Sequence, residues 1–170
     1  KIDVLWRNNL VKWMRKDHPK LVLDVATGTG DLAIAVQKGL EAEVVGLDLS
    51  QQMLNVGIDK IKKINLSDKI TMVKGDAENL TFEDNKFDAV SVAFGVRNFE
   101  NLEKGLAELR RVVKENGSVF ILEFSKVEGF LGPFYMFYFK NILPQIGKLV
   151  SKDNRAYTYL PDSVNAFPFG

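Results

Sequence analysis

A short turn rich in glycine and acidic residues carries the strongest chemical signal in the chain. Its sequence is Asp24-Val-Ala-Thr-Gly28-Thr-Gly30-Asp31, and it follows the apolar run that begins at Leu21. The two glycines permit a tight turn and let a ligand approach the backbone closely. The carboxylates of Asp24 and Asp31 would repel a pyrophosphate and stabilise a cation. The turn therefore predicts a site for a ligand that carries positive charge.

Acidic residues also follow the next two predicted strands. Asp48 ends the second strand, where its carboxylate can accept hydrogen bonds from both hydroxyls of a ribose. Asp76 and Ala77 follow the third strand, in position to contact the edge of an adenine. Any one of these signals alone is typical of an ordinary turn or helix cap. Together they favour a nucleoside-binding site, because ligands bind at the carboxyl ends of parallel strands.

The identity of the nucleoside cofactor rests on charge. The run Gly28-Thr-Gly-Asp-Leu-Ala33 also fits the loose dinucleotide pattern Gly-x-Gly-x-x-Gly/Ala, so a nicotinamide-dependent reductase stays an alternative. S-adenosylmethionine carries a sulfonium and an ammonium, and the two flanking carboxylates favour it. No Tyr-x-x-x-Lys pattern supports a reductase, and His18, the only histidine, precedes the first strand. A nucleotide-binding module without catalytic activity is a third alternative.

The fourth predicted strand ends in Phe94-Gly-Val-Arg97-Asn98, which faces the same edge of the sheet. Arg97 is a candidate catalytic residue, because a guanidinium can stabilise an anionic oxygen of the acceptor. Asn98 is the second candidate and would orient the acceptor or the donor. The alternative is structural: Asn98 would cap the following helix and Arg97 would be a surface charge.

Alternating strands and helices must position these residues. Residues 1–17 are predicted as a helix that His18-Pro19 ends. After it we expect strands at 21–25, 43–49, 70–74, 87–94 and 118–124, with helices at 31–38, from a Ser50 cap to Ile64, and from Leu102 to Asn116-Gly117. This order predicts an α/β fold with a doubly wound, Rossmann-like parallel sheet and helices on both faces.

A chain of 170 residues fits one domain. We expect an N-terminal helix in residues 1–20, a cofactor-binding core in 21–125 and an aromatic-rich substrate or cap segment in 126–170. The stretch 129–150 would receive a long apolar tail, lie on a membrane surface beside Lys140, Lys148 and Lys152, or pack onto the sheet.

Composition excludes several classes of partner. The net charge of +1 gives no basic field for nucleic acid, and the absence of cysteine excludes disulfides and thiolate metal sites. No metal is expected. No run of apolar residues is long enough to span a membrane, so we expect a cytoplasmic protein, with peripheral contact at the inner membrane face and a homodimer left open.

The chain resembles the ubiquinone/menaquinone biosynthesis C-methyltransferases over nearly its whole length. The shared motifs are Leu-Asp-Val-Ala-Thr-Gly-Thr-Gly-Asp31, Gly75-Asp-Ala-Glu-Asn, Phe87-Asp-Ala, Phe94-Gly-Val-Arg-Asn98, Arg111-Val-Val-Lys-Glu-Asn-Gly117, Leu122-Glu-Phe-Ser-Lys126, Leu143-Pro-Gln-Ile-Gly-Lys148 and Tyr157-Thr-Tyr-Leu-Pro-Asp-Ser163. Glycine turns occur in many methyltransferases, whereas Phe-Gly-x-Arg-Asn and Leu-Glu-Phe-Ser-Lys are close to diagnostic of this family.

The resemblance implies a class I methyltransferase that uses S-adenosylmethionine, releases S-adenosylhomocysteine and methylates a ring carbon of a prenylated quinol. It implies demethylmenaquinol as the acceptor, with the ubiquinol precursor as the alternative. Thr29, Asp48, Asp76 and Ala77 match the family's donor contacts. The full set expected to bind the donor is Asp24, Ala26, Gly28, Thr29, Gly30, Asp48, Leu49, Met53, Asp76, Ala77 and Phe94. Tyr157 and Tyr159 are further candidates to assist deprotonation of the quinol.

The chain also departs from the family pattern. Thr27 stands where members often have glycine, and Ala93 stands where they have serine, so a donor contact at position 93 is not carried over. The family's N-terminal segment and its last helix and two strands have no counterpart here. We therefore expect a trimmed chain whose last strand is an exposed edge, which an intact mass of 19.1 kDa would contradict.

Overall fold

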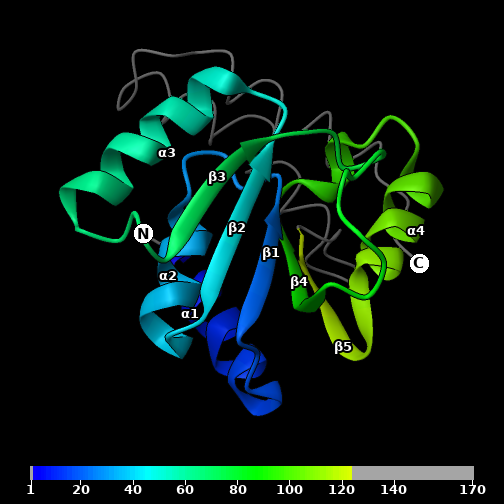
Figure 1. The fold of residues 1–170 in the computed structure, drawn as a ribbon, viewed down its shortest axis with the longest axis horizontal. Helices are drawn as coiled ribbons and strands as arrows, with labels where there is room; N and C mark the ends of the chain where they lie inside the picture. Colours follow the sequence, from blue (N-terminus) through cyan, green and yellow to red (C-terminus); the bar gives the residue numbers. More distant parts are fainter. Residues whose placement is uncertain (1, 124–170) are drawn as a thin grey trace, which may run out of the picture. The chain divides into compact units, whose positions relative to one another are not determined.

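Five parallel strands form one sheet in the order β3-β2-β1-β4-β5 (Figure 1). The computed structural model describes residues 2–123. Its strands are β1 (Leu21–Val25), β2 (Glu43–Asp48), β3 (Ile70–Lys74), β4 (Phe87–Ala93) and β5 (Val113–Leu122), and its helices are α1 (Ile2–Met14), α2 (Asp31–Leu40), α3 (Gln51–Lys63) and α4 (Leu102–Val112). Short 3-10 turns, η1 (Arg15–Asp17) and η2 (Val96–Asn98), complete the set. The predicted doubly wound parallel sheet is confirmed.

The order in which strands are added to the sheet reverses between β3 and β4, while all strands stay parallel. From β1 it moves outward through β2 to β3, and it then returns to the other side of β1 to add β4 and β5. Because parallel crossovers are right-handed, this reversal places α2 and α3 on one face and α4 on the other. It also opens a crevice at the carboxyl ends of β1 and β4, where ligands bind in sheets of this kind.

Helix α1 is fixed to the sheet through α2. Leu10, Val11 and Met14 are buried with Val36 of α2 in one apolar cluster. Gly39 permits the close approach of the two helices, because a Cβ there would lie 2.5 Å from Cγ1 of Val11. The last turns of the N-terminal helix are thus part of the core.

Two predicted boundaries were wrong at the junction of α4 and β5. We expected the helix to reach Asn116-Gly117, but it ends at Val112, and β5 starts at Val113 rather than Ser118. The helix stops because Asn85 N and Lys86 N donate to the last helical carbonyls, at 2.9 Å each. Gly117 does not end the helix. Its role is to permit a close approach of the backbone, because a Cβ there would lie 2.5 Å from the carbonyl oxygen of Asp88.

Several predictions fall on residues 124–170, which lie outside the described part. They are the aromatic-rich cap segment, the roles of Tyr157 and Tyr159, and the extent of the single domain. Within residues 2–123, β5 is the outer strand on its side of the sheet. No helix in that same range is long and apolar enough to cross a bilayer.

Candidate active site

A cavity of about 620 Å³ lies at the carboxyl ends of the central strands. This volume suits a nucleoside-sized cofactor. Eleven of the predicted site residues line it: Asp24, Ala26, Gly28, Thr29, Asp48, Leu49, Met53, Asp76, Ala77, Phe94 and Asn98. The structure thus brings the ends of four strands to one hollow, as the spacing of the motifs predicted. Among the predicted site residues within 2–123, Gly30 and Arg97 are the two that are not in this lining.

The turn after β1 is held by its own backbone and by one carboxylate. Gly28 has φ of +59° and Gly30 has φ of +77°, values that glycine adopts without strain. The N–H of Gly28 donates to Oδ2 of Asp48 at 2.8 Å, and the N–H of Gly30 donates to the carbonyl of Thr27 at 3.0 Å. The turn is therefore held by hydrogen bonds within the protein.

Asp48 links the ends of β1 and β2 and orients the helix that follows. Besides accepting from Gly28, it accepts from the N–H of Ser50 through Oδ1 at 2.8 Å. Ser50 in turn caps α3, because its hydroxyl oxygen accepts from Met53 N at 3.3 Å, as predicted. The carboxylate is fixed at the cavity wall, and each oxygen keeps a further lone pair for a ligand hydroxyl.

Asp24 lies at the base of the cavity and is buried rather than exposed to solvent. It is only 1% exposed, and it accepts from Thr27 Oγ1 at 2.6 Å and from Ser91 Oγ at 2.9 Å. Burial raises the pKa of this carboxyl to about 6, although the two hydroxyl donors act in the opposite direction. The second flanking carboxylate, Asp31, pairs with Lys60 at 2.8 Å. Both carboxylates were expected to act on a ligand as charges, but each of them has partners within the protein.

Residues 75–86 form a long connection between β3 and β4, and its first part, residues 75–78, forms another wall of the cavity. Asp76 begins it with a local turn, since Oδ1 accepts from Glu78 N at 2.9 Å and the carbonyl accepts from Asn79 N at 3.1 Å. Ala77 follows and is 8% exposed. Glu78 then accepts from Asn101 N at 2.9 Å, which joins this loop to the start of α4.

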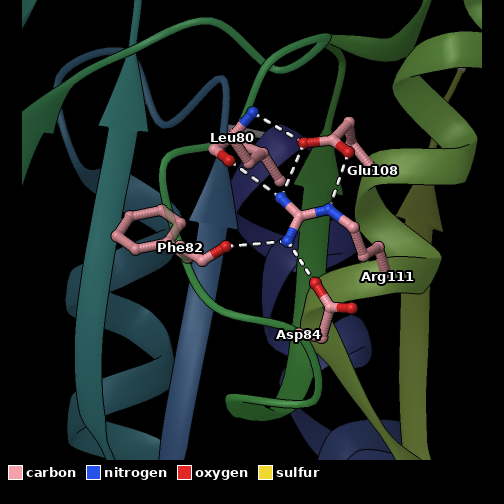
Figure 2. Close-up of polar contacts among 5 residues, drawn as sticks. All are labelled: Leu80, Phe82, Asp84, Glu108 and Arg111. Atoms are coloured by element: carbon pink, nitrogen blue, oxygen red, sulfur yellow. Dashed lines mark hydrogen bonds and ion pairs between the residues drawn. The ribbon is translucent and has the colours of Figure 1, made fainter.

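Arg111 at the end of α4 holds the rest of that loop (Figure 2). Its guanidinium donates to the carbonyls of Leu80 and Phe82, both at 2.8 Å, and to Asp84 at 2.7 Å. Glu108 accepts from two of its nitrogens, at 2.7 and 2.8 Å, and also from Leu80 N at 2.8 Å. We call Arg111 and Glu108 the α4 clamp. The paired guanidinium holds the pKa of Glu108 below its usual range.

Sequence reasoning missed the α4 clamp. Arg111 stands in a motif used for the resemblance, but its partners in the loop are 27–31 residues away, and no local pattern points to them. Two cavity neighbours from α1 were missed as well. Arg7 lines the cavity, and the ring of Trp6 lies 5.9 Å from the ring of Phe94.

At the end of β4, Arg97 is not a surface charge and Asn98 does not cap the following helix, so both structural alternatives are wrong. Arg97 is not a surface charge, because its side chain is 9% exposed and pairs with Glu123, 8% exposed, at 2.5 Å. Asn98 lines the cavity, and the cap of α4 is Asn101, which accepts from Lys104 N at 3.0 Å. The Arg97–Glu123 pair joins the two motifs, Phe-Gly-Val-Arg-Asn and Leu-Glu-Phe-Ser-Lys, that are close to family-diagnostic.

Solved structures place this fold and site in a class. A SAM dependent methyltransferase from Aquifex aeolicus matches with a TM-score of 0.59 and 28% identity, covering 65% of this chain and 59% of the other. A putative methyltransferase from Bacillus halodurans matches with a TM-score of 0.66 and 27% identity, covering 80% and 59%. The parallel sheet with a nucleoside-sized cavity at its switch point is that of the methyltransferases that use S-adenosylmethionine.

Sequence relatives narrow the class to one family. The model of the ubiE/COQ5 methyltransferase family matches residues 1–169, and the chain belongs to this family. It is 47% identical to demethylmenaquinone methyltransferase from Bacteroides fragilis, over 99% of this chain and 70% of that protein. It is 45% identical to ubiquinone/menaquinone biosynthesis C-methyltransferase UbiE from Geobacter sulfurreducens, over 98% and 66%. The family decides against the nicotinamide-dependent reductase.

Proposed function

We propose that this chain transfers the methyl group of S-adenosylmethionine to a ring carbon of demethylmenaquinol, which yields menaquinol and S-adenosylhomocysteine. The observation that carries the proposal is the cavity at the switch point, in a chain that is 47% identical to a demethylmenaquinone methyltransferase. The acceptor class follows from the names of the relatives, and the donor follows from the family.

The lining residues support one orientation of the donor in the cavity. In this orientation Asp48 would accept from the ribose hydroxyls, and Asp76 with Ala77 would contact the edge of the adenine; all three residues line the cavity. Leu49 and Met53 line the cavity while 65% and 44% exposed, so covering them with the adenine would remove apolar surface from water. The turn at Gly28 and Thr29 then receives the methionine part of the donor.

Methyl transfer mainly requires that the ring carbon, the methyl group and the sulfur be aligned. Methyl transfer is an in-line displacement: the bond from methyl to sulfur breaks as the bond to the ring carbon forms, and the sulfonium becomes the neutral thioether. The quinol must lose a phenolic proton to make the ring carbon nucleophilic, and the methylated carbon then loses its hydrogen as a proton to restore the aromatic ring. Asn98, in the cavity wall, is the candidate to orient the acceptor.

For Arg97 we propose a positioning role instead of direct contact with the phenolate. Its pairing with Glu123 fixes the segment that carries Asn98, the candidate to orient the acceptor. Replacing Arg97 with alanine should then lower turnover and leave the dissociation constant of the donor unchanged. Glu123→Gln should lower turnover in the same way, because it weakens the same pair. Full turnover in Arg97→Ala would contradict any role of Arg97 in the reaction.

The test of the function is a product assay. The purified chain is incubated with methyl-labelled S-adenosylmethionine and chemically reduced demethylmenaquinone, and the quinone is analysed by mass spectrometry. We expect one labelled methyl group on the ring with the reduced acceptor and none with the oxidised one. Calorimetric binding of NAD(H) but not of S-adenosylmethionine or S-adenosylhomocysteine would overturn the proposal.

A second acceptor of the same type is supported by the double name of some relatives, such as that from Geobacter sulfurreducens. The ubiquinol precursor would then be methylated at the equivalent carbon. Competition between the two reduced acceptors at equal concentration measures the ratio of their kcat/KM values. Peripheral membrane contact and a homodimer stay predictions, which liposome co-sedimentation and light scattering would test.

A further inference from the structure

Helix α1 brings one cationic side chain to the wall of the cavity. The buried face of the helix is formed by Leu10, Val11 and Met14. Arg7 lies one turn before Leu10 and Val11, so it continues that face beyond the core and reaches the cavity. Its side chain is 19% exposed. Since Val11 is locked against Gly39, Arg7 is held in place by the packing of its own helix.

The other charged residues in this wall all carry carboxylates. They are Asp24, Asp31, Asp48, Asp76, Glu78 and Glu100. Among the described residues that line the cavity, Arg7 alone is a cation. It lies near enough to Asp24 to act on that carboxyl electrostatically, in the direction that lowers the pKa. An arginine in an otherwise acidic wall marks the place where an anionic group of a ligand would be stabilised.

The donor has one such group. S-adenosylmethionine carries a sulfonium, an ammonium and a carboxylate, and the acidic wall can balance the two cations but would repel the carboxylate. Two other cations lie close to the site without belonging to the cavity lining. Lys60 donates to Thr29 Oγ1 at 2.7 Å and to Asp31 at 2.8 Å. Arg97 pairs with Glu123 at 2.5 Å. Arg7 is therefore the group that can receive the carboxylate.

We propose that Arg7 binds the carboxylate of the methionine moiety of the donor. The inference rests on the proposed function, because it takes the ligand to be S-adenosylmethionine. Asp3 accepts a hydrogen bond from Nη2 of Arg7 and so orients the guanidinium from one side. A guanidinium has five N–H donors in a planar fork, which leaves donors for the two oxygens of a carboxylate.

This contact gives the donor a second fixed end. Asp48 and the loop that starts at Asp76 hold the nucleoside, and Arg7 holds the opposite end of the molecule. The sulfonium lies between the two ends, so both anchors together define where the methyl group points. Because Arg7 belongs to α1, the N-terminal helix contributes directly to donor binding and not only to the core.

The test compares two donors on three proteins by calorimetry. S-adenosylmethionine and decarboxylated S-adenosylmethionine, which keeps both cations but lacks the carboxylate, are titrated into the natural chain, Arg7→Gln and Lys12→Gln. Lys12 is an exposed cation of the same helix and serves as the matched control. The natural chain should bind the complete donor roughly 10- to 100-fold more tightly than the decarboxylated one, the range for a charge-assisted pair.

Arg7→Gln should lose most of that discrimination, with weaker binding of the complete donor and nearly unchanged binding of the decarboxylated one, while Lys12→Gln should behave as the natural chain. Equal weakening of both donors in Arg7→Gln would overturn the proposal, because it would assign Arg7 a structural role. Unchanged affinity for the complete donor with a raised KM for the quinol would overturn it as well, in favour of an acceptor contact.

If Arg7→Gln does not fold, failure of the natural chain to discriminate between the donors decides against the proposal. If the natural chain bound neither donor, the proposed function itself would fail.

Discussion

Two walls of the same cavity are built in opposite ways. The turn after β1, residues 26–30, is short and is held by two glycines, its own backbone and the carboxylate of Asp48 from the next strand. The connection 75–86 is long, has almost no regular structure, and is held by Glu108 and Arg111 of α4 (Figure 2). Residues of both segments line the same cavity.

The two segments differ in which residues determine their conformation. The turn is encoded largely by adjacent residues, and its main support from elsewhere in the chain is the carboxylate of Asp48. The loop would lose conformational entropy on ordering, and contacts from a distant helix must offset that cost. We therefore expect damage at the turn to remove ligand contacts directly, and damage at the α4 clamp to act through the order of the loop.

Removing the carboxylate of Asp48 should have the largest effect. Asp48→Ala deletes the proposed ribose contact and frees the N–H groups of Gly28 and Ser50. We expect donor binding to weaken by about 2–4 kcal/mol, or about 30- to 1,000-fold, from the loss of charge-assisted hydrogen bonds. Calorimetric titration with S-adenosylhomocysteine measures it. Asp59→Ala, on the exposed side of α3, is the control; an unchanged affinity in Asp48→Ala would exclude the ribose assignment.

Breaking the α4 clamp should have a smaller and indirect effect. Arg111→Met keeps the apolar stem and removes every donor to the loop. We expect a loss of about 1–2 kcal/mol in the free energy of unfolding and roughly 5- to 20-fold weaker donor binding. Amide exchange of residues 76–84 should accelerate, while that of residues 26–30 should stay slow.

Arg110→Met provides the matched control, because Arg110 is the exposed neighbour of Arg111 on the same helix. Equal acceleration of exchange in the turn and in the loop would contradict the separation of the two walls. The same outcome in Arg110→Met would show that helix propensity, and not the clamp, causes the effect.

The buried carboxyl under the turn should make stability depend on pH. Because the pKa of Asp24 is raised in the folded state to about 6, the folded protein binds a proton that the unfolded chain releases between about pH 4 and 6. Asp24 thus destabilises the fold as pH rises through that window. We expect Asp24→Asn to remove this component, on the order of 2–3 kcal/mol across the window. Urea unfolding at a series of pH values measures the difference; parallel curves for the two proteins would contradict it.

The outermost support of the turn should matter least. Lys60 bonds to Thr29 and Asp31, but its side chain is 38% exposed and that of Asp31 is 48% exposed, so water screens the pair. Lys60→Met should change the free energy of unfolding by less than about 1 kcal/mol and donor binding by less than about 3-fold. A larger loss of donor affinity would mean that Lys60 takes part in binding the carboxylate of the donor.

The sequence predicted the parts of the site that depend on adjacent residues. The glycines at 28 and 30, the Ser50 cap and the acidic residue at the end of β2 all have local signatures, and alternation of strands and helices placed them at one edge. The end of α4 was predicted wrongly, because Asn-Gly is a common helix stop and the true stop depends on hydrogen bonds from residues 85 and 86.

What the sequence could not predict depends on pairs that are far apart in the chain. The α4 clamp, the Arg97–Glu123 pair and the approach of Arg7 to the cavity each join segments that meet only after folding. Charge alone was also misleading at Asp24, because its burial and its two hydroxyl donors could not be seen in a linear pattern.

The Arg97–Glu123 pair has a consequence for how this family can diverge. Two oppositely charged side chains that are both about nine-tenths buried stabilise each other, and either one alone would leave an uncompensated charge inside the protein. Substitution at one position should therefore be accompanied by substitution at the other, so that the two positions covary across relatives. A lineage that lost the pair would have to pass through an unstable intermediate, which would make both motifs slow to change.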